Sequence, residues 1–214
     1  MARPKTEQFT FLGAHPCLDF VNTAPAYERG EVLQDFEDLM EWLSAARLLP
    51  NSEISEAAWR WSGRHERQRT HREALAFRQQ LLDMLERIVA GRGVPEAAIA
   101  AINRILSERE GQVELVHTMG RFAQEFRRRL DRACQLLAPI AESATDLLCN
   151  RELNRVKRCA RPGCGFYFYE IARNRRRRWC SMKTCGNRMK LAAFHRRQRL
   201  AGRRRGQRHS PDQQ

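Results

Sequence analysis

Four cysteines that lie close together in the C-terminal part of the chain constrain its fold more than any other feature. They form two C-x4-C pairs, Cys159 with Cys164 and Cys180 with Cys185, separated by fifteen residues. Two close pairs of thiolates are what a tetrahedral Zn²⁺ site requires. The spacing therefore predicts a structural zinc module with these four side chains as its ligands.

The surrounding residues favour metal binding over the other uses of cysteine, which are disulfides, a redox pair or four unrelated thiols. Each pair is followed by a glycine, Gly165 and Gly186, and a left-handed glycine lets backbone amides fold back onto a ligating sulfur. No apolar segment of a secretory signal stands near Met1, so we expect a reducing, cytoplasmic location. The remaining cysteines stand alone among apolar neighbours: Cys17, Cys134 and Cys149.

Positive charge is concentrated in the same part of the chain. The sequence of 214 residues carries +14 in total, but residues 151–214 hold 20 Lys and Arg against three acidic residues, which leaves −3 for the first 150. A field of this sign attracts phosphate backbones, so we expect a nucleic acid as partner, with a merely solvated surface as the alternative. The longest apolar runs are too short to cross a bilayer, and no membrane partner is expected.

The first 150 residues have the pattern of a mainly helical domain. Apolar residues recur at helical spacing through most of it, with Pro50 and Pro95 between the segments. Residues 112–118 differ, because they are rich in β-branched side chains and Met119-Gly120 offers a turn into 121–126, which predicts a small β-hairpin. The expected helices follow a short apolar segment ending at Thr23 and cover residues 35–49, 51–61, 66–90, 95–106 and 130–150.

The predicted zinc module consists of a knuckle, a β-hairpin and a helix, the order of a treble-clef finger. Residues 166–169 form an aromatic, strand-forming run, and residues 175–179 can return as the second strand after a turn. The four rings of this run either all pack in the interior or leave one face to a partner. The helix after the second cysteine pair is expected to reach Ala201, with Gly202 as its stop and an inner face of Met189, Ala192, Ala193 and Leu200.

The expected fold class is therefore mainly α, a helical N-terminal domain with a small hairpin plus a treble-clef-like zinc module. The expected domains cover residues 1–150 and 155–202, followed by a basic disordered tail over 203–214.

Arginine supplies most of the positive charge, and its planar guanidinium can donate two parallel hydrogen bonds to one phosphate. Asn187 and Arg188 begin the last helix, where an asparagine suits adenine and an arginine suits guanine in a major groove. A cap or a bond to the knuckle backbone is the alternative for Asn187. The expected nucleic-acid contacts are Arg173, Arg175, Arg176, Arg177, Arg178, Asn187, Arg188, Lys190, Arg196 and Arg197.

These residues also resemble a known family. The run from Cys159 to Arg188, which ends in Cys185-Gly186-Asn187-Arg188, resembles the CGNR zinc finger of bacterial proteins. The resemblance implies a stress-responsive transcription regulator of bacteria whose finger binds DNA. Three N-terminal segments resemble the usual companion of this finger, the ABATE domain: Leu18-Asp19-Phe20-Val21-Asn22-Thr23, Trp42-Leu43 with Leu48-Leu49-Pro50, and Arg72-Glu73-Ala74-Leu75.

A regulator of this kind implies a sensing role for the N-terminal domain. A cavity lined by Asp19, Asn22, Arg72 and Glu73 would hold a small-molecule ligand. Catalysis is not expected, because no nucleophile elbow, phosphate loop or metalloprotease motif accompanies His15 and its polar neighbours Asp19 and Asn22.

Two questions about partners stay open at the level of the sequence. An RNA-binding or ribosome-associated factor is the alternative function, since the basic tail at 203–205 and exposed tyrosines suit RNA. A homodimer would match a palindromic DNA site, although the chain has no heptad seam that would supply one.

Overall fold

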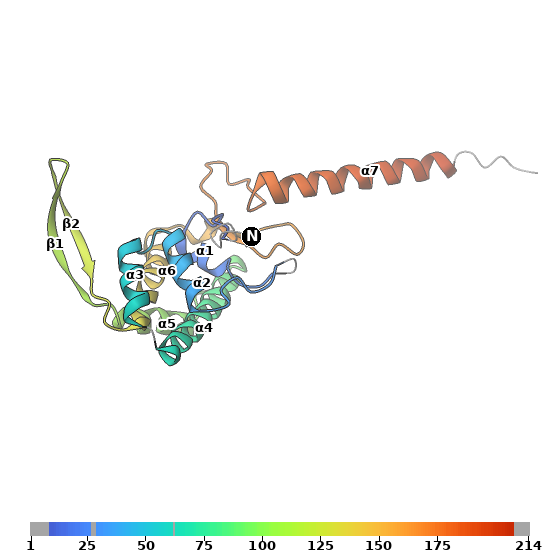
Figure 1. Cartoon of the computed structure of the whole chain (residues 1–214). Helices are drawn as coiled ribbons and strands as arrows, with labels where there is room; N and C mark the ends of the chain where they lie inside the picture. The colour runs from blue at the N-terminus through green and yellow to red at the C-terminus, as the bar shows by residue number, and fades with distance from the viewer. Residues whose placement is uncertain (1–8, 27–28, 62, 208–214) are drawn as a thin grey trace, which may run out of the picture.

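The protein has a helical body from which a β-hairpin and a long helix project on opposite sides (Figure 1). The computed structural model describes residues 9–26, 29–61 and 63–207. Helices dominate this part of the chain, and its two sheets are both two-stranded antiparallel hairpins. The predicted fold class, mainly α with a small hairpin and a C-terminal module built around four cysteines, is confirmed.

Three short helices open the chain. The apolar segment near the N-terminus forms helix α1 (Pro16–Val21), whose side chains are buried from its second residue onward. Helix α2 (Phe36–Ala45) is capped by Asp35, whose carboxylate accepts a backbone N–H of the first turn, and α3 (Asn51–Arg60) follows it directly.

Helix α2 ends earlier than the sequence predicted. We expected it to run to residue 49 and to stop at Pro50, but Arg47 takes a left-handed backbone conformation with φ of 56°. The Leu48 N–H then turns back and donates to the Leu43 carbonyl at 3.0 Å, a Schellman-type closure. The helix therefore ends about one turn before the proline.

The core of the body lies among three longer helices, α4 (Arg64–Val89), α5 (Glu96–Ser107) and α6 (Ala138–Asn150). Helix α4 contacts α1, α2 and α5, so it is the central element of the body. Its Phe77 and Leu85 side chains are completely buried. Helices α4 and α5 lie close to where the sequence predicted them.

One predicted helix, over residues 130–150, is divided into two elements. Residues Ala133–Leu137 form a 3-10 helix, η2, and the α-helix begins only at Ala138. The division has a covalent cause, because Pro139 has no backbone N–H to continue the hydrogen-bond ladder and is favoured in a first helical turn.

A β-hairpin projects from the body between α5 and η2. Its strands, β1 (Gly111–Thr118) and β2 (Arg121–Arg128), pair along their whole length. Met119 and Gly120 form the turn with φ of 51° and 75°, left-handed values that match the twist of a two-residue hairpin. The predicted hairpin is confirmed, and residues Gly111–Arg128 are called the arm below.

The zinc module begins with a different hairpin from the one predicted. Strand β4 (Tyr167–Tyr169) pairs antiparallel with β3 (Val156–Arg158), so the first cysteine pair lies in their connection. The predicted partner, residues 175–179, forms no strand. Burial explains the observed pairing, because Val156 and Tyr167 both reach into the hydrophobic core of the body.

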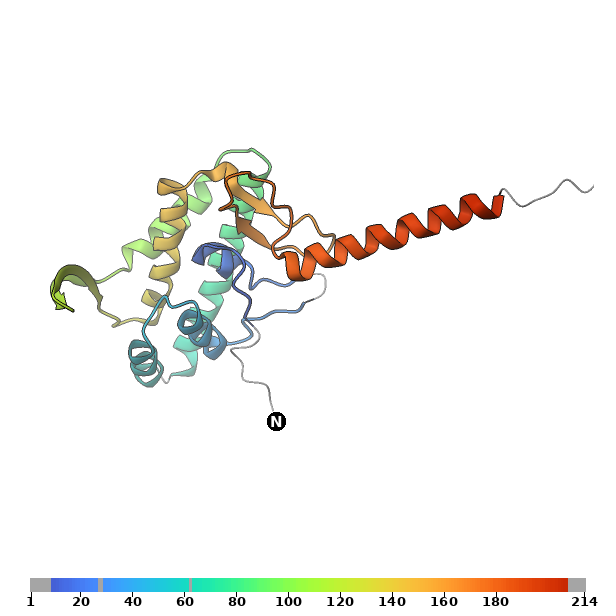
Figure 2. The same ribbon diagram turned by 90° about the horizontal axis from the view of Figure 1, so that it is seen from above.

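The last helix is longer and more exposed than predicted. After a π-helical turn, η4 (Met182–Gly186), helix α7 (Asn187–Gln207) extends for 21 residues and stands clear of the body (Figures 1 and 2). Gly202 does not end it, since a glycine inside a helix costs only about 1 kcal/mol. The helix therefore takes up residues 203–207 of the expected disordered tail, whose residues 208–214 lie outside the described part.

The expected inner face of this helix was also wrong, because the main contact of α7 is with the η4 turn at its start. Met189 is half-buried, and the remaining members of the face are exposed: Ala192, Ala193 and Leu200. Among the described residues, no helix combines the length and the hydropathy needed to cross a membrane.

Candidate metal centre and basic surface

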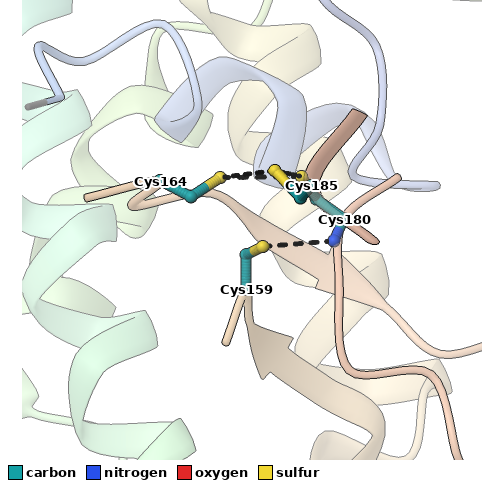
Figure 3. Close-up of side chains that lie close together, drawn as sticks. All are labelled: Cys159, Cys164, Cys180 and Cys185. Carbon is teal, nitrogen blue, oxygen red and sulfur yellow. Dashed lines mark hydrogen bonds between the residues drawn. The ribbon is translucent and has the colours of Figure 1, made fainter. Parts of the chain in front are cut away.

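The sulfur atoms of Cys159, Cys164, Cys180 and Cys185 converge on one point (Figure 3). All four lie within 4.8 Å of one another, and the three separations among Cys164, Cys180 and Cys185 are each 3.6 Å. A tetrahedron with Zn–S bonds of ~2.3 Å has edges of about 3.8 Å. The four side chains therefore fit one tetrahedral Zn²⁺, as their spacing predicted.

Local backbone structure positions the two pairs. Cys159 is held in the β3–β4 connection, where its N–H donates to the Phe166 carbonyl at 2.8 Å. The second pair encloses the η4 turn, whose first residues are capped by Ser181 through a bond from the Thr184 N–H at 3.3 Å. Each pair therefore belongs to a hydrogen-bonded turn that brings its two sulfurs to the same side.

The glycines that follow the two pairs serve different purposes. Gly165 takes φ of 75°, the left-handed conformation that the sequence predicted. Gly186 does not, and the same prediction was wrong for it. A Cβ at Gly186 would lie 2.4 Å from the Met182 sulfur, so a larger residue here would have to displace the exposed Met182 side chain.

Donors around the cluster favour thiolates. The Cys180 N–H donates to the Cys159 sulfur at 3.4 Å, and the Arg161 guanidinium donates to the Cys185 sulfur at 3.1 Å. The hydrogen bond between Cys180 and Cys164 lowers the pKa of Cys164 and raises the pKa of Cys180. Four thiolates so close together would repel one another, and a divalent cation supplies the compensating charge.

The metal centre has a small hydrophobic core of its own. Phe168 is completely buried beside the four cysteines, and Leu12 and Trp179 pack partly buried against them. Tyr167, the neighbour of Phe168 in strand β4, points to the other side and joins the core of the body. The aromatic run is thus packed on both faces, which was one of the two alternatives for these rings.

Glu170 organises the basic loop between the cysteine pairs. Its carboxylate is completely buried and accepts the N–H groups of Ala172 at 2.9 Å and Arg177 at 2.7 Å, with the Lys157 ammonium at 3.5 Å. Burial acts to raise the pKa of Glu170, but these bonds outweigh it and the pKa is lowered. The loop folds around this carboxylate. Its backbone N–H groups therefore bond to the Glu170 side chain and not to a neighbouring strand, as the predicted return strand would have required.

Arg177 and Arg175, both predicted nucleic-acid contacts, interact with other side chains of the protein. The Arg177 guanidinium lies over the Phe168 ring at 4.3 Å and donates to the Trp179 carbonyl at 3.0 Å. Arg175 forms an ion pair with Glu152 at 2.6 Å. Arg177 therefore stabilises the module, and Arg175 is partly neutralised.

The other predicted contacts lie on exposed surface. Asn187 is exposed too, but its amide donates to the Lys183 carbonyl at 3.2 Å. That contact is the backbone bond that we gave as the alternative to a base contact. The remaining exposed residues form two groups, Arg173, Arg176 and Arg178 on the loop and Arg188, Lys190, Arg196 and Arg197 on α7.

The four residues expected to line a ligand cavity are dispersed. Asp19 is buried, and its carboxylate accepts the Gly13 N–H at 2.7 Å; burial raises its pKa to about 6. Asn22 is bonded to the backbone of strand β4. Arg72 lines a groove between α2 and α4, and Glu73 pairs with a neighbouring arginine of the same helix. Among the described residues, Asn22 and Arg72 line different pockets, so the structure does not bring the four side chains together there.

A different pocket, of about 520 Å³, lies where the zinc module meets the body. Asn22 lines it after α1, Glu86 lines it from α4, and Arg158 and Arg161 line it from the knuckle. The Tyr167 side chain also lines it, and its buried hydroxyl has no hydrogen-bond partner among the described residues. No sequence pattern indicated this pocket, because its walls come from three segments, near residues 21–26, 82–86 and 158–167, that are far apart in the sequence.

A Ser–His–Asp arrangement at the start of α1 was also missed. His15 lies 3.1 Å from the Ser143 hydroxyl through Nδ1 and 3.1 Å from the Asp146 carboxylate through Nε2. Ser143 accepts the Cys17 N–H at 2.9 Å, and both His15 and Ser143 are buried. The serine is not presented to solvent, so we interpret this network as a structural tie between α1 and α6.

Comparison with known families adds two matches. Residues 14–151, more than half of the chain, match the protein-family model ABATE, whose description is "Putative stress-induced transcription regulator". Residues 155–198 match the model of the CGNR zinc finger. Neither description is that of an enzyme. A search of curated proteins found no match to the chain.

Proposed function

This chain belongs to the ABATE family and carries a CGNR zinc finger, and from this premise we propose that it is a DNA-binding transcription regulator. One observation carries the proposal: α7 stands clear of the body (Figure 2) and follows directly on the η4 turn, which contains Cys185. This helix has eight Lys and Arg and no acidic residue. A strongly cationic helix that projects from the body is suited to a polyanion.

The dimensions of α7 suit a groove of DNA. At a rise of 1.5 Å per residue its length is about 31 Å, close to one turn of the double helix. The major groove of B-DNA admits an α-helix. In this arrangement Arg188, in the first turn of α7 next to the metal centre, reaches base edges. Arg196 and Arg197, farther along the helix, contact phosphates. The exposed arginines of the loop extend the phosphate contacts beyond the groove.

The same geometry favours DNA over RNA. Double-stranded RNA has a deep and narrow major groove that a helix of this kind does not enter, and single-stranded RNA is bound mainly by exposed aromatic platforms. The aromatic run of this protein is packed in the interior, with Tyr167 and Phe168 fully buried. RNA binding therefore stays the alternative outcome.

We further propose that the N-terminal domain senses a small molecule in the pocket between the two parts of the chain. A ligand there would contact α4 and the knuckle at once, and opposite charges from Glu86 and Arg158 face the space it would fill. Its binding would then stabilise one placement of the zinc module on the body. A regulator of bacterial genes would work in the cytoplasm, where free thiols stay reduced.

Equilibrium binding tests the proposed function. The zinc-loaded protein is titrated into fluorescent duplex DNA, duplex RNA and single-stranded DNA of equal length at several salt concentrations. We expect the tightest binding to duplex DNA, with log K falling against log salt at a slope of about −5, as six phosphate contacts require. Preference for RNA would favour the alternative, and binding that ignores salt would contradict phosphate contacts altogether.

A further inference from the structure

The arm presents an apolar face to solvent. Alternate residues of paired strands share one face, which in the arm is formed by Val113, Leu115 and His117 of β1 with Phe122, Gln124 and Phe126 of β2. Val113, Leu115 and Phe122 are 64%, 72% and 71% exposed, and Met119 at the tip is 98% exposed. Large apolar side chains grouped in this way on a soluble surface indicate an interaction site.

The exposure belongs to a well-formed hairpin. The strands are in register from end to end, and the His117 ring stacks on Phe122 at 4.5 Å. The base is fixed to the body, where Arg109 lies over the Phe126 ring at 3.5 Å and Arg128 pairs with Glu142 at 2.7 Å. Beyond this base the arm stands away from the helices (Figure 1).

We propose that this face packs against the same face of a second copy of the chain, so that two arms form a homodimer. An isolated two-stranded hairpin is marginal in water and needs a second layer on its apolar side. Two arms placed face to face around a twofold axis supply that layer to each other. The same residues then meet on both sides, as an isologous interface requires.

Charge distinguishes a protein partner from the other candidates. The six side chains of the apolar face include no Lys, Arg, Asp or Glu. Nucleic acids and anionic lipid surfaces are both attracted by clustered positive charge, which this face lacks. Glu114, Glu125 and Arg127 lie on the opposite face, and Arg128, at the base of the apolar face, is paired with Glu142 of the body.

The available area fits a reversible dimer. Four exposed apolar side chains, Val113, Leu115, Met119 and Phe122, would bury about 1,000 Å² between two copies, the size of a weak and transient interface. We therefore expect dissociation in the micromolar range. This inference does not rest on the proposed function, because a dimer through the arm would form with or without DNA.

Sedimentation equilibrium of the zinc-loaded, full-length protein tests the inference with two matched substitutions. Leu115→Asp places a charge on the apolar face, and we expect the dimer dissociation constant to rise by roughly 100-fold or more, since each dimer carries the change twice. Val116→Asp makes the same kind of change one residue away on the opposite face. For it we expect less than about a threefold change.

A variant in which a short glycine-serine turn replaces residues 112–127 should sediment as a monomer. The inference is overturned by a wild-type protein that stays monomeric at about 200 μM, well above the expected constant. A dimer that survives removal of the arm would overturn it too, as would equal dissociation of both aspartate variants. A monomer that still binds DNA would overturn this inference alone and leave the proposed function intact.

Discussion

Asn22, at the end of helix α1, satisfies both backbone groups of Tyr167 in strand β4. Its side-chain amide donates to the Tyr167 carbonyl at 2.8 Å and accepts the Tyr167 N–H at 2.7 Å. A side chain from the N-terminal domain thus takes the place of a neighbouring strand at the edge of the β3–β4 hairpin. The hydrophobic core also joins the two parts of the chain, because it includes Val156 and Tyr167 together with residues from the helices of the body. The zinc module therefore depends on the body for part of its fold.

Removing this link should destabilise the whole chain. We expect Asn22→Ala to lower the free energy of unfolding by about 2–4 kcal/mol, because it leaves a buried N–H and a buried carbonyl of Tyr167 without partners. Urea unfolding of the zinc-loaded protein measures the change. Asn154→Ala is the control, since Asn154 is exposed and its replacement should stay within about 0.5 kcal/mol of the wild type. Equal effects of the two changes would contradict the role given to Asn22.

Loss of the metal should destabilise the N-terminal body as well as the zinc module. We expect the wild-type protein to bind one Zn²⁺ and Cys180→Ser to bind it at least ten times more weakly, measured by competition with a chromophoric chelator. Thermal unfolding of the body should also shift to lower temperature in the variant, because Tyr167 is anchored from both sides.

The matched control is Cys149→Ser, which removes an exposed cysteine outside the cluster. It should keep both the metal and the melting temperature. Full zinc affinity in Cys180→Ser would refute the assigned ligand set, and an unchanged body would refute the coupling.

Local chemistry explains which features the sequence predicted. The ligand set follows from cysteine spacing within two turns, and the arm from β-branched residues that precede the Met119-Gly120 turn, so neither depends on distant contacts. The pairing of β4 is different in kind. The pairing is decided by burial of Tyr167 among helices that lie far away in the sequence. Strand propensity alone predicted residues 175–179 as the partner of β4, because propensity depends only on local sequence.

The site residues show the same division. A run of arginines indicates positive charge, but which of them is free depends on the fold. Glu170 turns the loop so that Arg177 points inward over Phe168, and nothing in the order of the residues distinguishes Arg177 from Arg176. The pocket beside the knuckle was missed for the same reason, since it exists only once the knuckle is seated on α4.

This difference between arginines leads to a prediction about binding. Arg196→Gln with Arg197→Gln removes two exposed charges of α7, so the slope of log K against log salt should become less steep by about 2 while stability is unchanged. Arg177→Gln removes one charge that is bonded within the module. It should lower the free energy of unfolding of the module. The protein that stays folded should show nearly the same slope of log K against log salt as the wild type. Binding isotherms at several salt concentrations, with urea unfolding of each variant, separate the two effects; a reversed pattern would show that Arg177 is the phosphate contact.

The carboxyl group of Asp19 should make stability depend on pH in an unusual direction. Burial raises its pKa from 3.8 to about 6, although backbone N–H bonds from Gly13 and Leu12 oppose the shift. The folded state therefore binds a proton more tightly than the unfolded state does, so this group contributes stability at low pH that is lost as the pH rises through about 6. A shift of this size corresponds to about 3 kcal/mol at neutral pH.

Asp19→Asn keeps an oxygen for the Gly13 N–H and removes the charge, so it should stabilise the protein at pH 7 by about 1–3 kcal/mol and by much less near pH 4. Urea unfolding across this range, taken as the difference from wild type, cancels the titration of the zinc ligands. A difference for Asp19→Asn that does not vary with pH would mean that Asp19 is ionised in the folded protein at no cost.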